Sequence, residues 1–252
     1  MMGENVVIAY NAINDIVSYL IARLERDPRV NLHRSPVTIS IKDDKVILEG
    51  RVDNIAEKRA AVDTVTRVLC KLGRWFVVDQ LHVKPTRHRQ DLELMQAVAL
   101  SLSNEPVFRE YSLLTKVGKH IEVYQDMGVD SMAVIVMLER GCITLAGQVQ
   151  SLSHRRLAEV LMWWTDGCEF VDNQLQVVPA EQDTDNEITD AIRCVLEKDP
   201  LVHAAQLQVG TAGGVVLMNG TVASGEEKKL AVRDAWYVPG VADVVDHIRA
   251  RA

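Results

Sequence analysis

Three short segments of this 252-residue chain share one pattern of apolar residues around a glycine, and this repeat limits the fold more than any other feature. The segments are 46–52, 143–149 and 216–222, and their glycines are Gly50, Gly147 and Gly220. Apolar residues four and two positions before the glycine and two after it are typical of a half-buried strand. Glycine in such a strand marks a place where a side chain would crowd its neighbour. The pattern predicts three copies of one small module.

The flanking residues predict the other elements of each module. A second glycine follows the first at 23, 20 and 20 residues, and the segment between them is typical of a helix that begins after Asn54, Ser151 or Ser224. The second glycines are Gly73, Gly167 and Gly240. A short strand follows each of them. Upstream, a helix with apolar residues every four positions ends at an acidic residue and proline, and a first strand then forms a hairpin with the glycine strand.

Each copy therefore consists of helix, strand, strand, helix and strand. The predicted fold class is α+β, with three tandem αββαβ modules, each a small three-stranded mixed sheet with two helices packed on one face. The predicted modules are residues 1–88, 89–180 and 181–252. From proline to glycine, the second copy takes 41 residues against 22 and 20 in the first and third, which places an insertion near residues 108–130. The insertion is too apolar for a solvated linker, so we expect it to be ordered.

Charge is unevenly distributed and narrows the choice of partner. Residues 1–88 hold 14 Lys and Arg against 11 Asp and Glu, a net charge of +3, whereas each of the other two modules carries −5. An acidic chain with a pI near 5.5 argues against general nucleic-acid binding, because phosphate contact needs a basic face. Only the first module has the charge to favour an anionic surface.

The sequence holds no pattern that supports an enzyme, a metal site or a cofactor. Four single cysteines, without a CxxC pair, predict free thiols, and the histidines lack the spacing of a local metal site. We find no catalytic motif and no apolar stretch long enough to span a membrane. The sequence shows no signal peptide pattern, which predicts a cytoplasmic protein. Such a protein is either free in the cytoplasm or bound peripherally to the membrane.

The glycine strands, the Pro239-Gly240-Val241 turn and the endings at residues 78–81 and 172–175 resemble the BON domain family (bacterial OsmY and nodulation). The resemblance covers nearly the whole chain as three modules. It implies the αββαβ fold and a non-catalytic role. Members of the family are linked to osmotic stress, to envelope integrity through phospholipid contact and, in one branch, to potassium binding.

A basic pair and an aromatic residue are the candidates for contact with lipid or another anion. The pairs lie eight and nine residues after each first glycine, near the start of the second helix, and Trp75 lies beside Gly73 in the net-basic module. The candidate residues are Lys58, Arg59, Trp75, Arg155, Arg156, Lys228 and Lys229. Basic side chains on a helix are more often its solvated face. Phe76 and Trp164 are further candidates for exposed aromatic residues.

Two functions follow. The first is a peripheral binder of anionic phospholipid or envelope components, linked to osmotic or envelope stress and led by the first module. The alternative is a soluble stress-response module that binds an ion such as potassium, or a protein. The sequence does not decide between these two functions. It also leaves open whether the chain forms a homo-oligomer.

Overall fold

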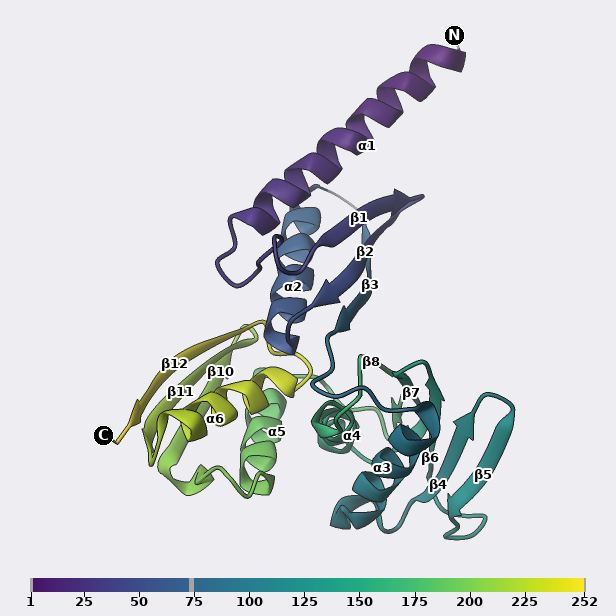
Figure 1. Ribbon diagram of the computed structural model, residues 1–252, viewed down its shortest axis with the longest axis vertical. Coiled ribbons are helices and arrows are strands. Elements are labelled where there is room, and N and C mark those ends of the chain that lie inside the picture. The colour runs from purple at the N-terminus through teal and green to yellow at the C-terminus, as the bar shows by residue number, and fades with distance from the viewer. Residues whose placement is uncertain (1, 73–74, 252) are drawn as a thin grey trace. The chain divides into compact units, whose positions relative to one another are not determined.

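The computed structural model describes residues 2–72 and 75–251, with side chains from residue 14 onward except that of Leu72. The chain divides into two compact units, Met1–Lys84 and Pro85–Ala252 (Figure 1). The first unit contains one αββαβ module, and the second contains the elements of two. Among the described residues, no helix combines the length and the apolar character needed to cross a membrane.

The first unit forms a three-stranded mixed sheet, as the sequence predicts. Strand β2 pairs antiparallel with β1 and parallel with β3, in the order β1-β2-β3. The elements are α1 (Met2–Glu25), β1 (Val37–Lys42), β2 (Lys45–Val52), α2 (Ile55–Leu72) and β3 (Phe76–Val83).

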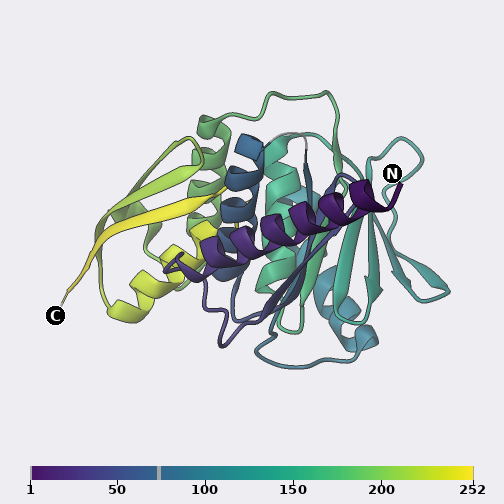
Figure 2. The ribbon, with the colours of Figure 1, turned by 90° about the horizontal axis from the view of Figure 1, so that it is seen from above.

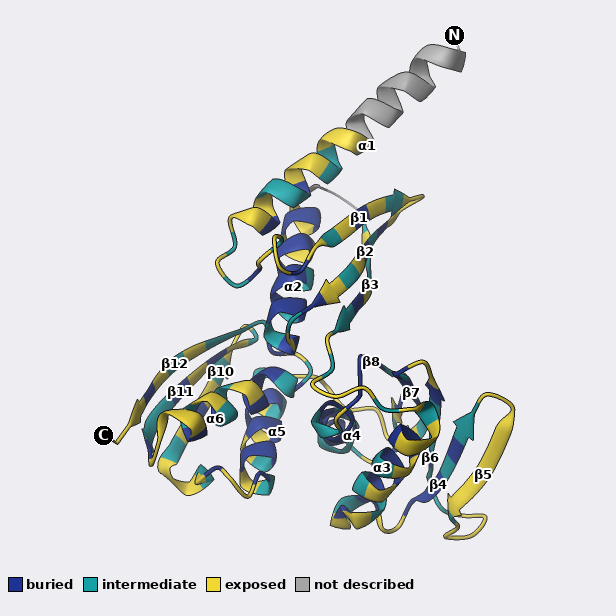
Figure 3. Ribbon diagram, in the orientation of Figure 1, coloured by how far each residue is buried: buried dark blue, intermediate teal, exposed yellow. Residues whose placement is uncertain are grey.

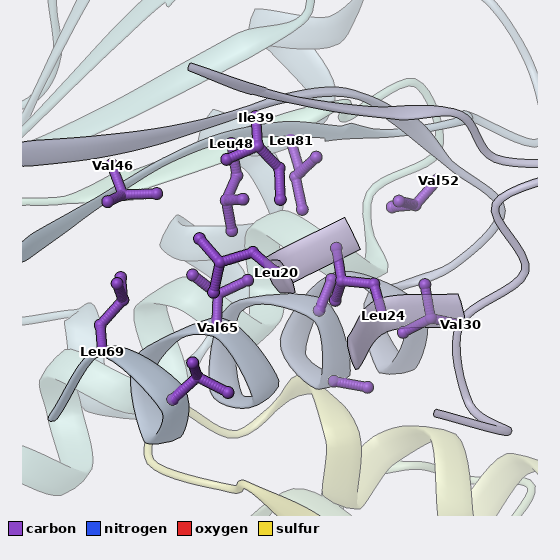
Figure 4. Packing of buried hydrophobic residues seen from close by; sticks show 13 residues of the cluster. Leu20, Leu24, Val30, Ile39, Val46, Leu48, Val52, Val65, Leu69 and Leu81 are labelled. Atoms are coloured by element: carbon purple, nitrogen blue, oxygen red, sulfur yellow. The ribbon is translucent and has the colours of Figure 1, made fainter. Parts of the chain in front are cut away.

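Both helices of this unit bury their apolar sides against one face of the sheet. Leu20 and Leu24 of α1 and Leu69 of α2 meet Val46 and Leu48 of β2, all nearly inaccessible to solvent (Figure 4). The core therefore takes every second residue of each strand, since alternate side chains point to opposite faces. The remaining side chains lie on the open face of the sheet.

The second unit repeats the plan twice. Its second module contains α3 (Asp91–Asn104), η1 (Pro106–Phe108), β4 (Ser112–Val117), β5 (His120–Gln125), β6 (Ala133–Glu139), β7 (Cys142–Val149), α4 (Leu152–Trp164), β8 (Phe170–Asn173) and β9 (Gln176–Val177). Its third module contains α5 (Asp185–Lys198), η2 (Ala204–Gln206), β10 (Leu207–Ala212), β11 (Val215–Val222), α6 (Gly225–Tyr237) and β12 (Asp243–Ala250). The sheet order β10-β11-β12 matches that of the first unit (Figure 1). Figure 2 shows α5 and α6 on the same side of this sheet.

The sheet of the second module is larger than the three strands expected. The residues of the insertion form β4 and β5, and β4 pairs in parallel with the outer edge of β6. The third-strand region also divides into β8 and β9, both parallel to β7. The sheet therefore has six strands, in the order β5-β4-β6-β7-β8 with β9 also on β7.

The strand glycines are required by close backbone contact. A Cβ added at Gly50, Gly147 or Gly220 would lie 2.4, 2.0 or 2.2 Å from a carbonyl oxygen of the preceding segment. These glycines also have φ values of 142°, 114° and 138°, which side-chain-bearing residues rarely adopt. The second glycines, Gly167 and Gly240, also have positive φ, and Gly73 lies outside the described residues.

A buried acceptor supports the start of the second helix in the first and third modules. Glu57, which is 5% exposed, accepts hydrogen bonds from Asn31 N (2.8 Å), Asp53 N (2.9 Å) and Ser35 Oγ (2.8 Å). Glu227 accepts in the same way from the backbone nitrogens of His203 and Ala223, both at 2.8 Å. These backbone hydrogen bonds lower the pKa of Glu227, which keeps the carboxylate charged.

The second module uses neutral groups at this place. The Tyr111 hydroxyl accepts from Gln150 N at 3.0 Å and lies 2.8 Å from His154 Nδ1. His154 occupies the position of Glu57 and Glu227, three residues after the N-cap serine. Phe108 packs edge-on against both rings. An aromatic cluster thus takes the role of a carboxylate.

Candidate functional site

The first member of each basic pair faces into its own module. Lys58 is 5% exposed, and its Nζ lies 2.7 Å from Asp79 Oδ1 and donates to Leu81 O at 2.5 Å. Lys228 likewise donates to Ile248 O at 2.7 Å and pairs with Asp246 Oδ2 at 2.9 Å. Both ammonium groups therefore join the second helix to the third strand.

Arg155 makes the corresponding link in the second module. Its Nη2 donates to Asn173 O at 3.2 Å, and Asn173 Nδ2 returns a bond to Arg155 O at 2.9 Å. Asp79, Asn173 and Asp246 occupy the same place on the third strand. The recurrence of this link in all three modules indicates a structural role for these three basic residues.

The second members of the pairs lie in three different environments. Arg59 is half-buried on α2. Arg156 is only 2% exposed, because its Nε donates to Pro239 O at 3.2 Å and its Nη2 pairs with Asp183. Lys229 is exposed and pairs with Glu226 at 2.7 Å. The pairs thus do not form one uniform basic surface, since Lys229 alone among the six residues is exposed.

The aromatic candidates also differ in how far they are exposed to solvent. Trp75 packs partly buried against the core of the first module. Trp164 is half-buried, and its Nε1 donates to Asp234 Oδ1 at 3.1 Å in the third module. Phe76, the neighbour of Trp75, is 61% exposed. Of these three side chains, Phe76 is the most accessible to a partner.

Phe76 lies on the open face of the first module's sheet, beside residues that the sequence pattern did not indicate as candidates. In register, Lys42 faces Lys45 across β1 and β2, and Lys45 faces Phe76 across β2 and β3. Ile47 and Val78 form the next pair on the same face and are half-buried. Figure 3 shows that exposed and intermediate stretches alternate along the strands of this sheet. We refer to Lys42, Lys45, Ile47, Phe76 and Val78 as the basic face. Both lysines are exposed.

The corresponding positions of the other modules lack this chemistry. At the places of Lys42, Lys45 and Phe76, the third module has Ala212, Val215 and Asp243. The second module has Glu139, Cys142 and Phe170 there. The combination of two lysines and an aromatic ring therefore distinguishes the first module. Alternation along β1 and β2 could have identified the lysines, but only the parallel register of β3 brings Phe76 beside them.

Comparison with known proteins gives consistent matches. The family described as BON domain matches residues 14–85, 112–179 and 184–252. Osmotically-inducible protein Y of Escherichia coli (strain K12) is 26% identical over 162 residues, which cover 62% of this chain and 80% of that protein. An uncharacterized protein in the gshII 5' region of Anaplasma centrale is 26% identical over 145 residues, covering 56% of this chain and 93% of its own.

Among solved structures, the C-terminal domain of CdsD, a structural protein of the type III secretion system of Chlamydia trachomatis, aligns with 16% identity. The alignment covers 92% of this chain and 98% of that one, with a TM-score of 0.25.

Proposed function

Since the chain belongs to the BON domain family, we propose that it is a non-catalytic binding protein of osmotic or envelope stress whose first module contacts anionic phospholipid. The name of the Escherichia coli relative, an osmotically inducible protein, supports the stress role. The basic face supports the lipid contact. Through this contact the chain would bind a membrane as a peripheral protein. Its location on the cytoplasmic side is the prediction made from the sequence.

The observation that carries the proposal is the adjacency of Lys42, Lys45 and Phe76 on the face of the sheet opposite to the core that α1 and α2 cover. Each basic residue close to an anionic bilayer contributes about 1 kcal/mol, which salt screens. An exposed aromatic ring beside these charges can enter the headgroup region and bury apolar area there. Charge and apolar contact therefore act from the same surface.

The candidate residues predicted from the sequence have different roles in this proposal. Arg59 and Trp75 of the first module, and Lys229 of the third, stay as candidates for contact because their module does not enclose them fully. Lys58 supports the fold, so reversing its charge would disrupt the module rather than test lipid contact.

A vesicle sedimentation experiment with the full chain tests the proposal. We expect the protein to sediment with phosphatidylglycerol–phosphatidylcholine vesicles at low salt, and not with phosphatidylcholine alone. Lys42→Gln combined with Lys45→Gln should remove most of this binding. The matched control is Ala212→Glu with Val215→Glu, which changes the net charge equally at the same positions of the third module and should leave the binding largely intact.

Phe76→Ala separates the apolar contribution from the charges. It should weaken binding while leaving the steepness of the salt dependence unchanged, because the number of basic contacts stays the same. Failure of the full chain to sediment with anionic vesicles would overturn the lipid contact. Equal loss in the lysine variant and in the control would show that net charge, and not the basic face, governs binding.

A protein partner is the second candidate, and exposed apolar side chains favour it. Ile121 and Val123 on the edge strand β5 are 67% and 57% exposed, and they lie on the open face of the second module's sheet. Exposed apolar groups on a sheet edge are typical of surfaces that bind another chain. Ile121→Lys with Val123→Lys would reduce binding of such a partner and leave vesicle binding of the first module in place.

A further inference from the structure

The second and third modules share a contact made by α4, α5 and α6, and one acidic side chain lies fully inside it. Asp234 of α6 is inaccessible to solvent, and one of its oxygens, Oδ1, accepts the 3.1 Å hydrogen bond from Trp164 of α4. A buried carboxyl group needs a partner for each polar atom, because it has lost its water. Trp164 supplies a partner for one oxygen.

The other oxygen of Asp234 is next to a second carboxyl group. Oδ2 is buried and receives no hydrogen bond from any donor of the described residues. Its neighbour is Asp199, which follows α5 and is 9% exposed. Asp199 Oδ1 already accepts from Leu201 N at 2.8 Å. Two carboxyl groups in contact form a hydrogen bond only when one of them carries a proton.

The first module has a hydroxyl group instead of a second carboxyl group at the position that corresponds to Asp234. Thr64 and Asp234 each lie fourteen residues after the strand glycine, and Asp27 and Asp199 each precede the proline. The Thr64 hydroxyl donates to Asp27 Oδ2 at 2.6 Å. This position of the repeat therefore holds a donor to the acidic residue. In the third module, a protonated Asp234 would be that donor.

We propose that Asp234 is a proton-dependent lock between α6 and the end of α5, inside the third module and next to α4 of the second. In its neutral form it donates to Asp199, as Thr64 donates to Asp27, and holds α6 to the end of α5. Loss of the proton leaves two negative carboxylates in contact and weakens the attachment of α6. This attachment is therefore tight at neutral pH and loosens as the solution becomes alkaline.

The electrostatic surroundings agree with this geometry. Burial, and next the hydrogen bond and charge of Asp199, raise the pKa of Asp234 to about 8. Trp164 and Arg233 act in the opposite direction and do not offset these effects. Asp166 and Cys168, which follow α4, face Tyr237 beside Asp234. Burial raises the pKa of both the thiol and the phenol, so these two groups stay neutral in the range where Asp234 ionises.

The sign of the pH effect follows from linkage. An unfolded Asp loses its proton near pH 3.8, whereas the folded one keeps it to about 8. Between these values, folding takes up a proton, so the contribution of Asp234 to stability falls as pH rises. At its steepest, the unfolding equilibrium constant should increase about tenfold per pH unit relative to a variant without the carboxyl group.

The first test follows the Trp164 indole N–H by NMR in the full chain, from about pH 5 to about pH 9. Because this group donates to Asp234, its signal should shift with a midpoint near pH 8. Trp164→Phe identifies the signal, and Asp234→Asn should abolish the shift. A signal that stays constant over this range, or shifts equally in Asp234→Asn, would overturn the proposal.

The second test replaces Asp234 with the residue of the first module. Asp234→Thr should keep the hydrogen bond to Asp199 and remove the pH dependence. We expect the ratio of unfolding constants, wild type over Asp234→Thr, to rise steadily between about pH 5 and about pH 7.5 in urea denaturation of the second unit. A ratio independent of pH would contradict the lock. If the Thr variant does not fold, the titration of Trp164 in the unaltered chain decides.

Discussion

The second module has the same backbone plan as the first and third, but it supports that plan with different chemistry. Glu57 and Glu227 each accept from backbone N–H groups through a buried carboxylate, whereas in the second module the neutral Tyr111 hydroxyl accepts from Gln150 N and contacts His154 Nδ1. Tyr111 lies directly before β4, so the change of acceptor comes with the inserted strands. The comparison shows that the fold requires a hydrogen-bond acceptor at this place and does not require a charge.

The strand glycine is the feature that all three modules share, and its replacement should have the largest effect. In Gly147→Ala, the new Cβ would meet Ala133 O at 2.0 Å and the residue would keep a φ of 114°. We expect a loss of about 4 kcal/mol or more in the free energy of unfolding, measured by urea denaturation.

Gly210 is the matched control for this change. It also lies in a strand of the second unit, but nothing lies within 4 Å of an added Cβ there. Gly210→Ala should leave the free energy of unfolding nearly unchanged. Equal urea midpoints for the two variants would show that the close contact does not constrain the repeat.

Removal of the buried carboxylate should have the next largest effect. Glu57→Leu leaves Asn31 N, Asp53 N and Ser35 Oγ without their acceptor, at a cost of about 3 kcal/mol to the first unit. Glu57→Gln, which keeps one acceptor oxygen, should cost less. Thermal unfolding monitored by circular dichroism can rank the two variants, and a Leu variant as stable as the wild type would break the comparison.

Tyr111→Phe tests the neutral acceptor and should have a smaller effect. It removes the partner of Gln150 N and of His154 Nδ1 but keeps the ring in the aromatic cluster. We expect a loss of about 1 to 2 kcal/mol, because fewer groups are left unpaired than in Glu57→Leu. A loss larger than that of Glu57→Leu would reverse the ranking of the two supports.

Lowering the pH should distinguish the neutral support of the second module from the carboxylate of the third. The expected change in stability is the smallest of those considered. Burial lowers the pKa of His154, so its neutral form is favoured in the folded state. Its contribution to stability is complete above the unfolded pKa of 6.5 and is lost as pH falls through the folded value. The contribution of Glu227 persists further, because its pKa is lowered from 4.5.

Relative to His154→Gln, the wild-type second unit should therefore lose stability as pH falls below about 6.5, because only the wild type has this imidazole to protonate. Urea midpoints measured at several pH values check this expectation. If the two proteins respond equally to acid, His154 does not carry the difference between the modules.

The sequence predicted the αββαβ plan because alternation and glycine position are local properties. Strands β1, β2, β10 and β11, the N-caps and the inserted segment all follow from neighbouring residues. The roles of Lys58 and Arg156 did not, because their partners, Asp79 and Pro239, are distant in the chain. Adjacent positions on a helix also face different directions, so the basic pairs could not be treated as one surface.

The candidate site illustrates the same limit. Lys42 and Lys45 are close in the chain, but Phe76 joins them only through the parallel pairing of β2 and β3. Asp234 lies among charged residues of α6 and has the sequence context of a solvated acid. Its burial follows from the packing of α4, which belongs to another module.

The hairpin of β4 and β5 enters the second module between its first helix and its first strand, and the pairing of β6 with β7 keeps the register of the other modules. The loop between the first helix and the first strand therefore accommodates an inserted segment without a change in the strand pairing. The third module has the same loop in short form, after Pro200. A reporter hairpin or binding epitope grafted there would extend the sheet at β10 and leave the parent domain folded.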